Sequence, residues 1–402
     1  MTKIVDSQVT GARAITQSAA TDSPIRRLPL IFVTYACMFV FGAILLLMGS
    51  LLPSLQLSYA RAGNLGSFPL AGILAATVLV GPLLDRFGVK PALGLALILV
   101  AAALAVMPSL HSYPGLAAAA LAYGVGGGVL NTATNALVSD LSASARGAAL
   151  NLLGFSFSLG ALSAPLLMSL AGGALLPSLA LRVLATAAAI ILIPILWLRF
   201  PSPSQPKASV QGLLRVLNRP LVWLFGALLF FESGSENCMF VWSSKLTADL
   251  LQIGAARANL SLVALSSSLG VGRLLAVVWL RWLNGRNMIL VSATTAVAGA
   301  SLVYCKFGFT SMLEGFVMLG LGLSAIFPTA LGLAGDRFRE TGTVFGAIMT
   351  VALVGGTAGP TLAAWLAKTG PERILDLPIV SAVMVVALVL IIASPSVVPR
   401  IE

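Results

Sequence analysis

Long apolar runs separated by short polar stretches repeat along the chain from about residue 29 onward. Each run has the roughly 20 residues that an α-helix needs to cross the hydrocarbon core of a bilayer. The pattern predicts twelve membrane-spanning helices, at residues 29–52, 66–84, 91–109, 115–138, 148–172, 178–199, 220–243, 257–280, 287–306, 312–333, 342–366 and 376–395. Because the number of spans is even, both chain ends are expected on the same side of the membrane.

The composition supports a membrane protein and argues against other classes. Hydrophobic side chains make up 58% of the 402 residues and charged side chains only 9%, whereas soluble domains carry about 25% charged residues. So few charges cannot cover the surface of a soluble protein of this size. The net charge of +11 comes from scattered basic residues, a pattern typical of a positive cytoplasmic face. We therefore expect a lipid bilayer, and no nucleic acid, around this chain.

The 24 Lys and Arg residues are divided unevenly between the connections. Sixteen lie on the side of the N-terminal tail, seven lie on the opposite side, and Arg273 lies within a span. An excess of basic residues marks cytoplasmic connections, so both ends are predicted to be cytoplasmic. We expect a monomeric, multi-pass protein of a bacterial inner membrane.

One long polar interruption, FPSPSQPKASVQGLLRVLNR at 200–219, divides the chain near its midpoint. It predicts a cytoplasmic linker between two six-helix halves, 29–199 and 220–402, and the polar residues 1–28 predict a disordered cytoplasmic tail. An internal repeat supports the division, because GALSAP at 160–165 has a counterpart GGTAGP at 355–360, an offset of 195 residues. The predicted fold class is all-α, with two parallel six-helix repeats, as in many secondary transporters.

The turn after the second span, GPLLDRFGVKPAL at 81–93, combines glycines with charged residues. Glycines permit a sharp turn, and an acid there can cap a helix or pair with a base on a neighbouring helix. The turn resembles the signature loop between helices 2 and 3 of the major facilitator superfamily. Val89 stands where the family pattern has a basic residue, which implies a weaker charge network. The resemblance implies a conformational gating loop formed by Gly81, Asp85, Arg86, Gly88 and Lys90.

Four further blocks resemble the fucose:proton symporter family and its bacterial sugar-permease relatives. They are AYGVGGGVLNTATNALVSDLSASARGAALNLLGFSFSLGALSAP at 122–165, ESGSENCMFVW at 232–242, LGVGR at 269–273 and GLGLSAIFPTALGLAGDRF at 320–338. Together with the gating loop they touch both halves, so the resemblance covers nearly the whole chain. It implies the twelve-helix major facilitator fold and a sugar or sugar-like solute.

Three positions depart from the resembled family in ways that affect proton coupling. Several members carry an acid in helix 1 and another at the position of Asn131, whereas helix 1 here has no acid and Asn131 cannot titrate. The family's usual histidine in the N-L-L-x-x-F stretch is Gly154 here. The proton-coupling residues of the family therefore cannot be transferred to the first half of this chain.

Asn131 and Asn135 lie one helical turn apart in the fourth predicted span. Amides in hydrocarbon are costly unless paired, so these two should face a cavity or another helix. One interpretation is hydrogen bonding to a polyhydroxylated solute, for which an amide offers donors and an acceptor. The other is interhelical bonding beside the glycine-rich stripe at 124–128. Both stay open for Asn131, whereas the second is favoured for Asn135, and Asn151 is interpreted as structural.

Glu232 and Glu236 in the seventh span are four residues apart and share one helix face. At about 1.5 Å per residue, Glu232 lies roughly 18 Å from the predicted cytoplasmic end of its helix, in the middle of the membrane. Arg273 in the eighth span lies roughly 10 Å from the same end, and its long side chain can reach toward the acids. Charged groups at this depth are candidates for function. They predict an ion pair that serves proton coupling, or a salt bridge that only clamps two helices.

Several aromatic residues and prolines complete the candidates. Phe155, Phe157, Phe327 and Trp242 are able to stack on the apolar face of a sugar ring, although most aromatic residues in such helices face lipid or the core. Pro165, Pro328 and Pro360 are expected to break spans 5, 10 and 11 locally. The predicted solute-binding residues are Asn131, Asn135, Glu236, Trp242 and Phe327.

Enzyme chemistry and metal binding have no support in the sequence. Cys37, Cys238 and Cys305 lie far apart in apolar runs, a spacing that suggests neither a disulfide framework nor a metal site. The sequence has no nucleotide-binding glycine loop followed by Lys-Ser/Thr, no His/Cys cluster and no catalytic triad. We therefore expect a protein that is not an enzyme and that carries no cofactor.

These observations predict a secondary transporter or facilitator of a small polar solute, sugar or sugar-like, that works by alternating access, with protons as a candidate second partner. One alternative is an exporter of hydrophobic or cationic compounds, because two acids lie in an otherwise apolar cavity. Another is a non-transporting membrane sensor. A sensor needs an extended cytoplasmic domain, which neither the predicted tail nor the predicted linker provides.

Overall fold

The computed structural model describes residues 27–141, 146–170, 176–201, 218–338 and 341–394, without the side chains of residues 27, 82, 85, 146–148, 151, 176 and 341–343. All regular structure in these ranges is helical. Almost all of the predicted tail and most of the predicted linker lie outside the described residues, and so do the side chains of Asp85 and Asn151.

The described helices correspond to the twelve predicted spans. Eleven spans are long and apolar enough to cross a membrane, whereas α9 is not among them, although its 32 residues make it the longest helix described. Glu232, Glu236 and Asn237 lie in its middle and lower its hydropathy. The helices are α2 (Arg27–Leu51), α3 (Tyr59–Phe87), α4 (Val89–Val106), α5 (Tyr113–Leu141), α6 (Arg146–Leu170), α7 (Leu176–Trp197), α9 (Pro220–Leu251), α10 (Ala255–Trp279), α11 (Gly285–Tyr304), α12 (Phe309–Ser324), α13 (Ile326–Gly335), α14 (Thr341–Leu366) and α15 (Asp376–Ile392). The all-α, twelve-span fold class is confirmed.

The tenth span is broken into α12 and α13 at Ala325. Pro328 is the third residue of α13 and has no N–H to bond the carbonyl of Ser324, so the helical ladder is interrupted there. Breaks were also predicted at Pro165 and Pro360, but α6 and α14 continue through these residues. A proline removes one hydrogen bond from a helix, and this loss accompanies a break in the tenth span but not at Pro165 or Pro360.

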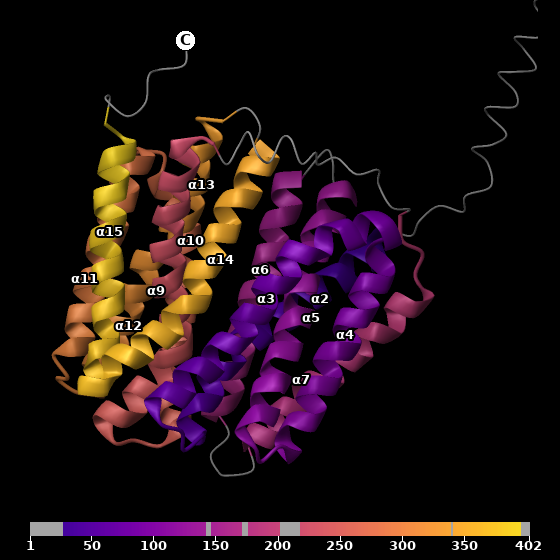
Figure 1. The fold of residues 1–402 in the computed structure, drawn as a ribbon, viewed down its shortest axis with the longest axis horizontal. Coiled ribbons are helices and arrows are strands. Elements are labelled where there is room, and N and C mark those ends of the chain that lie inside the picture. Colours follow the sequence, from indigo (N-terminus) through magenta and orange to yellow (C-terminus); the bar gives the residue numbers. More distant parts are fainter. Residues whose placement is uncertain (1–26, 142–145, 171–175, 202–217, 339–340, 395–402) are drawn as a thin grey trace, which may run out of the picture.

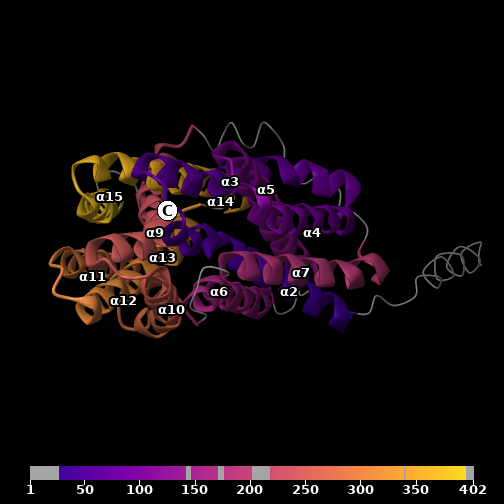
Figure 2. The ribbon, with the colours of Figure 1, turned by 90° about the horizontal axis from the view of Figure 1, so that it is seen from below.

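The helices form two groups that lie side by side, α2–α7 and α9–α15 (Figure 1). At their boundary α6 lies beside α10 and α3 lies beside α14 (Figure 2). We call the end of the bundle where α7 ends and α9 begins the linker end, and the opposite end the far end. Consecutive spans run in opposite directions, so the connections between them alternate between the linker end and the far end.

Buried apolar residues join the two groups at the far end. One core cluster contains residues of α2–α7 together with the far-end parts of the second group, such as Trp242, Leu246 and Ala364. A second cluster is confined to the linker-end parts of α9, α11, α13, α14 and α15, and it includes Phe225 and Ile289. The groups are therefore packed together at the far end, and the second group has a core of its own at the linker end.

Candidate functional site

Five polar residues gather in the middle of α9 and on the facing part of α10, and we call them the central cluster. They are Glu232, Ser233, Glu236 and Asn237 of α9 and Arg273 of α10. Arg273 Nη2 lies 3.5 Å from Glu236 Oε1, and the side chains of these two residues keep 36% and 15% of their surface exposed. A single long contact and a partly open guanidinium leave most N–H groups of Arg273 free to bind something else.

Glu232 is the most deeply buried member of the cluster, with only 1% of its surface exposed. Within the described residues, no donor bonds either of its carboxylate oxygens. Its polar neighbours are Glu236, one helical turn away, and Arg273. A charged carboxylate without a donor in an apolar environment costs several kcal/mol, so Glu232 is a candidate for function.

Close helix packing holds the cluster in place. Gly272 lies against Ser324 at the end of α12, with no room for a side chain, so α10 touches the tenth span next to its break at Ala325. Gly356 of α14 lies against Asn237, whose amide nitrogen is 2.9 Å from the place a Cβ would occupy. The cluster therefore rests on α10, α12 and α14, and its geometry depends on small residues of these helices.

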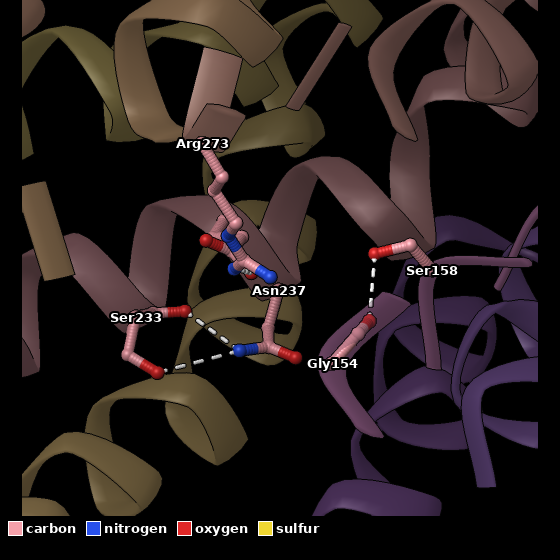
Figure 3. A network of polar contacts seen from close by, with 6 residues as sticks. Gly154, Ser158, Ser233, Asn237 and Arg273 are labelled. Atoms are coloured by element: carbon pink, nitrogen blue, oxygen red, sulfur yellow. Dashed lines mark hydrogen bonds and ion pairs between the residues drawn. The ribbon is translucent and has the colours of Figure 1, made fainter. Parts of the chain in front are cut away.

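Asn237 is oriented by a bond to its own helix. Its amide nitrogen donates to the Ser233 carbonyl at 2.9 Å and lies 3.4 Å from the Ser233 hydroxyl. Figure 3 shows the amide oxygen of Asn237 directed toward the part of α6 that carries Gly154 and Ser158, while the amide nitrogen faces Ser233. Residues of both helix groups thus face the same region.

The two predicted asparagines of α5 bond to each other. Asn135 donates to the Asn131 carbonyl at 2.8 Å and to the Asn131 side-chain oxygen at 3.1 Å. Both residues are half-buried. The hydrogen bonds described for this pair stay within α5, so they do not act as the interhelical bonds considered from the sequence.

The predicted aromatic residues are dispersed. Trp242 is fully buried, its Nε1 donates to the Pro360 carbonyl at 3.0 Å, and its ring stacks on Tyr59. In this conformation it offers no surface to a solute, because the far end is closed around it. Phe327 packs half-buried against the linker-end core of the second group. Phe157 lies 5.5 Å from Phe41, measured between ring centroids.

Phe155 and Gly154, which are neighbours on α6, are not covered by other parts of the described structure. Phe155 has 54% of its surface exposed. Gly154 has no atom within 4 Å of the place that a Cβ would occupy.

The predicted gating loop is shorter in the structure, because Gly81, Asp85 and Arg86 belong to the last turns of α3 and Lys90 to the first turn of α4. Gly88 alone connects the two helices. Gly88 has φ 82°, a left-handed conformation that residues with a side chain rarely adopt. Lys90 Nζ donates to the carbonyls of Leu196 and Leu198 at 2.9 and 3.0 Å, where it complements the negative end of α7. Arg86 lies over the Phe87 ring at 5.2 Å. The same turn borders a surface hollow of about 370 Å³ that also touches residues 199–201.

At the far end, polar contacts join the two groups through residues that the sequence did not indicate. The Tyr59 hydroxyl donates to Asp249, and Lys245 Nζ lies 3.0 Å from the same carboxylate and 5.2 Å from the centre of the Tyr59 ring. Nearby, Asn259 donates to the Ser50 carbonyl at 3.2 Å. We call Tyr59, Lys245 and Asp249 the far-end latch.

Glycines allow the backbones to approach closely beside this latch. Gly49 of α2 lies against the backbone of Phe240, and Gly66 of α3 lies against the side chain of Val241. Any side chain at either glycine would collide. The far end is therefore closed by both tight packing and polar contacts.

A bundle of membrane-length helices in two groups, with charged and amide side chains in the middle of α9, is the architecture of a polytopic membrane protein. The chain belongs to the Major Facilitator Superfamily, whose family description matches residues 29–360. It is a transporter and not an enzyme. No curated protein sequence matches the chain significantly.

Solved structures with a similar fold include three transporters. The D-xylose-proton symporter is 16% identical with a TM-score of 0.73, over 91% of this chain and 97% of that chain. The nucleoside transporter NupG is 12% identical with a TM-score of 0.74, over 91% and 98%. The E. coli fucose:proton symporter FucP is 15% identical with a TM-score of 0.63, over 92% and 99%. Identities this low show a shared fold only.

Proposed function

We propose that the chain carries a small polar solute, sugar or sugar-like, across the membrane by alternating access. The central cluster carries this proposal, because it places a partly exposed Arg273, Glu236 and the Asn237 amide oxygen at one point in the middle of the bundle. Hydroxyl groups both donate and accept hydrogen bonds, so a polyhydroxylated solute suits this mixture of donors and acceptors. Nucleosides, xylose and fucose are the solutes in the names of the similar structures.

The two ends of the bundle support the alternating part of the proposal. The groups are joined at the far end by one shared core and by the far-end latch, whereas at the linker end the second group has a separate core. This arrangement is what a state closed at the far end requires. Opening the far end means breaking the latch, and a solute at the central cluster would then reach the other side.

Purified protein in detergent provides the direct test. The protein is screened by thermal shift against pentoses, hexoses, nucleosides, amino acids and drug-like cations. We expect a hydroxylated compound to raise its unfolding temperature. A ligand at about 100 times its Kd adds about 2.7 kcal/mol to stability. Arg273→Gln should abolish that shift while the protein still folds. Stabilisation by hydrophobic cations alone would instead identify an exporter and overturn the sugar-like solute.

We propose that the linker end faces the cytoplasm and that 29–199 and 220–402 are the two moving halves, joined by residues 200–219. The excess of basic residues on this side supports the orientation. Single cysteines at Ser204 and His111, in a background without the three native cysteines, should react with impermeant reagents from opposite sides. Reaction from one side for both positions would contradict the topology.

We propose that Glu232 carries the proton if transport is coupled. Its burial, the lack of a donor and the neighbouring Glu236 favour the neutral acid, while Arg273 balances the charge of Glu236. One proton is then bound per cycle. Glu232→Gln imitates the protonated acid, so it should keep counterflow exchange and lose uphill accumulation driven by a pH gradient in proteoliposomes.

The control is Glu236→Gln, which leaves Arg273 without its partner and should weaken binding itself. If the wild-type protein never accumulates solute above equilibrium under a pH gradient or a membrane potential, the protein is a facilitator. Glu232 would then be a structural acid only.

A further inference from the structure

Gly154 and its neighbour Phe155 lie on an open side of α6, a helix that is packed on its other side. The buried residues Leu153, Ala161 and Ala164 hold α6 against α2. A Cβ at Gly154 would meet no atom within 4 Å. Glycine inside a helix costs roughly 0.5–1 kcal/mol relative to alanine, and nothing in the packing of this conformation requires it. Its presence therefore calls for another reason.

The direction in which Gly154 faces suggests that reason. In Figure 3 Gly154 and Ser158 of α6 lie on the side of Asn237 that is away from Ser233. Ser158 donates to the Gly154 carbonyl at 3.0 Å, so its oxygen keeps lone pairs for another donor. The Asn237 amide nitrogen is occupied by Ser233, which leaves the amide oxygen as the free group on the other side. Free polar atoms thus border the open position.

We infer that Gly154 determines the size of the solute. The side chain it lacks leaves space between α6 and the central cluster, and the part of the solute that is not bonded by Arg273 and Glu236 lies in this space. The inference rests on the proposed central solute site and deepens it. It predicts that a larger residue at position 154 excludes large solutes and tolerates small ones, without preventing folding.

The first experiment asks whether position 154 faces water, and it needs no solute. Gly154→Cys, in a background without the three native cysteines, is reconstituted and treated with a charged, water-soluble thiosulfonate or with a lipid-soluble maleimide. The matched control is Leu152→Cys, which is about 160° away around the helix. Leu152 has 50% of its surface exposed.

The cysteine at 154 should react with the water-soluble reagent at least about tenfold faster than the cysteine at 152, which should react with the lipid-soluble reagent. Equal rates, or reaction at 154 with the lipid-soluble reagent only, would show that Gly154 faces lipid and would overturn the inference.

The second experiment measures the size preference directly. Gly154→Leu and the wild type are compared in binding of a pentose, a nucleoside and a disaccharide. Overfilling a packed site costs about 1–3 kcal/mol, so the affinity for the largest bound solute should fall about 5- to 150-fold relative to the pentose. Gly254→Leu is the control, because Gly254 also has open space around it and lies in the far-end turn between α9 and α10.

The results separate this inference from the proposed function. An equal loss for all solutes would indicate a conformational defect and overturn the size role of Gly154. If the wild type binds none of the three compounds, the proposed solute class fails, and the cysteine experiment alone decides whether Gly154 borders a water-filled space.

Discussion

Replacing Tyr59 by phenylalanine removes one hydroxyl group from the contact that joins the two helix groups at the far end. The hydroxyl donates to Asp249, which stays paired with Lys245 on its own helix at 3.0 Å. The ring remains, and so do its stacking on Trp242 at 5.5 Å and its contact with the Lys245 ammonium. Tyr59→Phe therefore tests one hydrogen bond between the groups and leaves the apolar packing intact.

The size of the effect of Tyr59→Phe depends on the hydrogen-bond partner that the Tyr59 hydroxyl has when the far end is closed and when it is open. A hydrogen bond to a charged acceptor contributes about 1.5–3 kcal/mol to stability. When the far end opens, water replaces Asp249 as the partner, so the closed state alone loses this bond in the variant. Because the latch is partly exposed to solvent, we expect the lower value, about 1.5 kcal/mol. The ratio of open to closed molecules should then rise about tenfold.

Thiol labelling measures this ratio. Val241 lies against Gly66 and is 4% exposed, so a cysteine at 241 is covered while the far end is closed. Its reaction rate with an impermeant reagent reports the open fraction, and Tyr59→Phe should raise it about tenfold. The control is Tyr113→Phe, whose hydroxyl donates to the Arg61 carbonyl within the first group. An unchanged rate, or an equal increase in the control, would refute the latch.

Three further substitutions test the architecture. Lys90→Met removes the cap at the end of α7 and should lower the free energy of unfolding by about 1 kcal/mol, as measured by thermal unfolding. Pro328→Ala restores the missing N–H at the break of the tenth span, so it should raise the unfolding temperature and slow counterflow exchange; faster exchange would contradict a role for the break. A leucine at position 49 would collide with the Phe240 backbone, so Gly49→Leu should prevent the far end from closing. The cysteine at 241 should then react faster than in Tyr59→Phe.

The sequence predicts the spans well because a bilayer demands length and apolarity from each helix separately. It predicts α9 less clearly, since Glu232, Glu236 and Asn237 lower the hydropathy of this helix, and the same residues are the ones that form the central cluster. The acids and Arg273 were found because charges in an apolar run stand out. Asn237 was missed, although an amide next to Glu236 in a membrane span carries the same signal.

Local sequence patterns do not predict the contacts between the two helix groups. Tyr59 lies before the predicted start of the second span at residue 66, because Arg61 and Asn64 interrupt the apolar run, yet α3 begins at Tyr59. Its partner Asp249 is 190 residues away. Trp242 was predicted as a stacking residue from its type, but the closure of the far end buries it completely. Contacts between residues of different groups depend on how the groups pack, and the periodicity of a single helix does not predict this packing.

α9 links the central cluster to the far-end latch. Glu232 and Glu236 lie near its middle. Lys245 and Asp249 lie further toward the far end, at roughly 14 and 20 Å from Glu236 along the helix axis. The helix continues without a break between them, and Trp242 ties it to α14 through the Pro360 carbonyl. A tilt of α9 that loosens the latch must therefore also move the acids relative to Gly154 on the other group. A change of charge or of bound solute at the cluster shifts the latch by the same movement, because a rigid helix cannot displace one end alone.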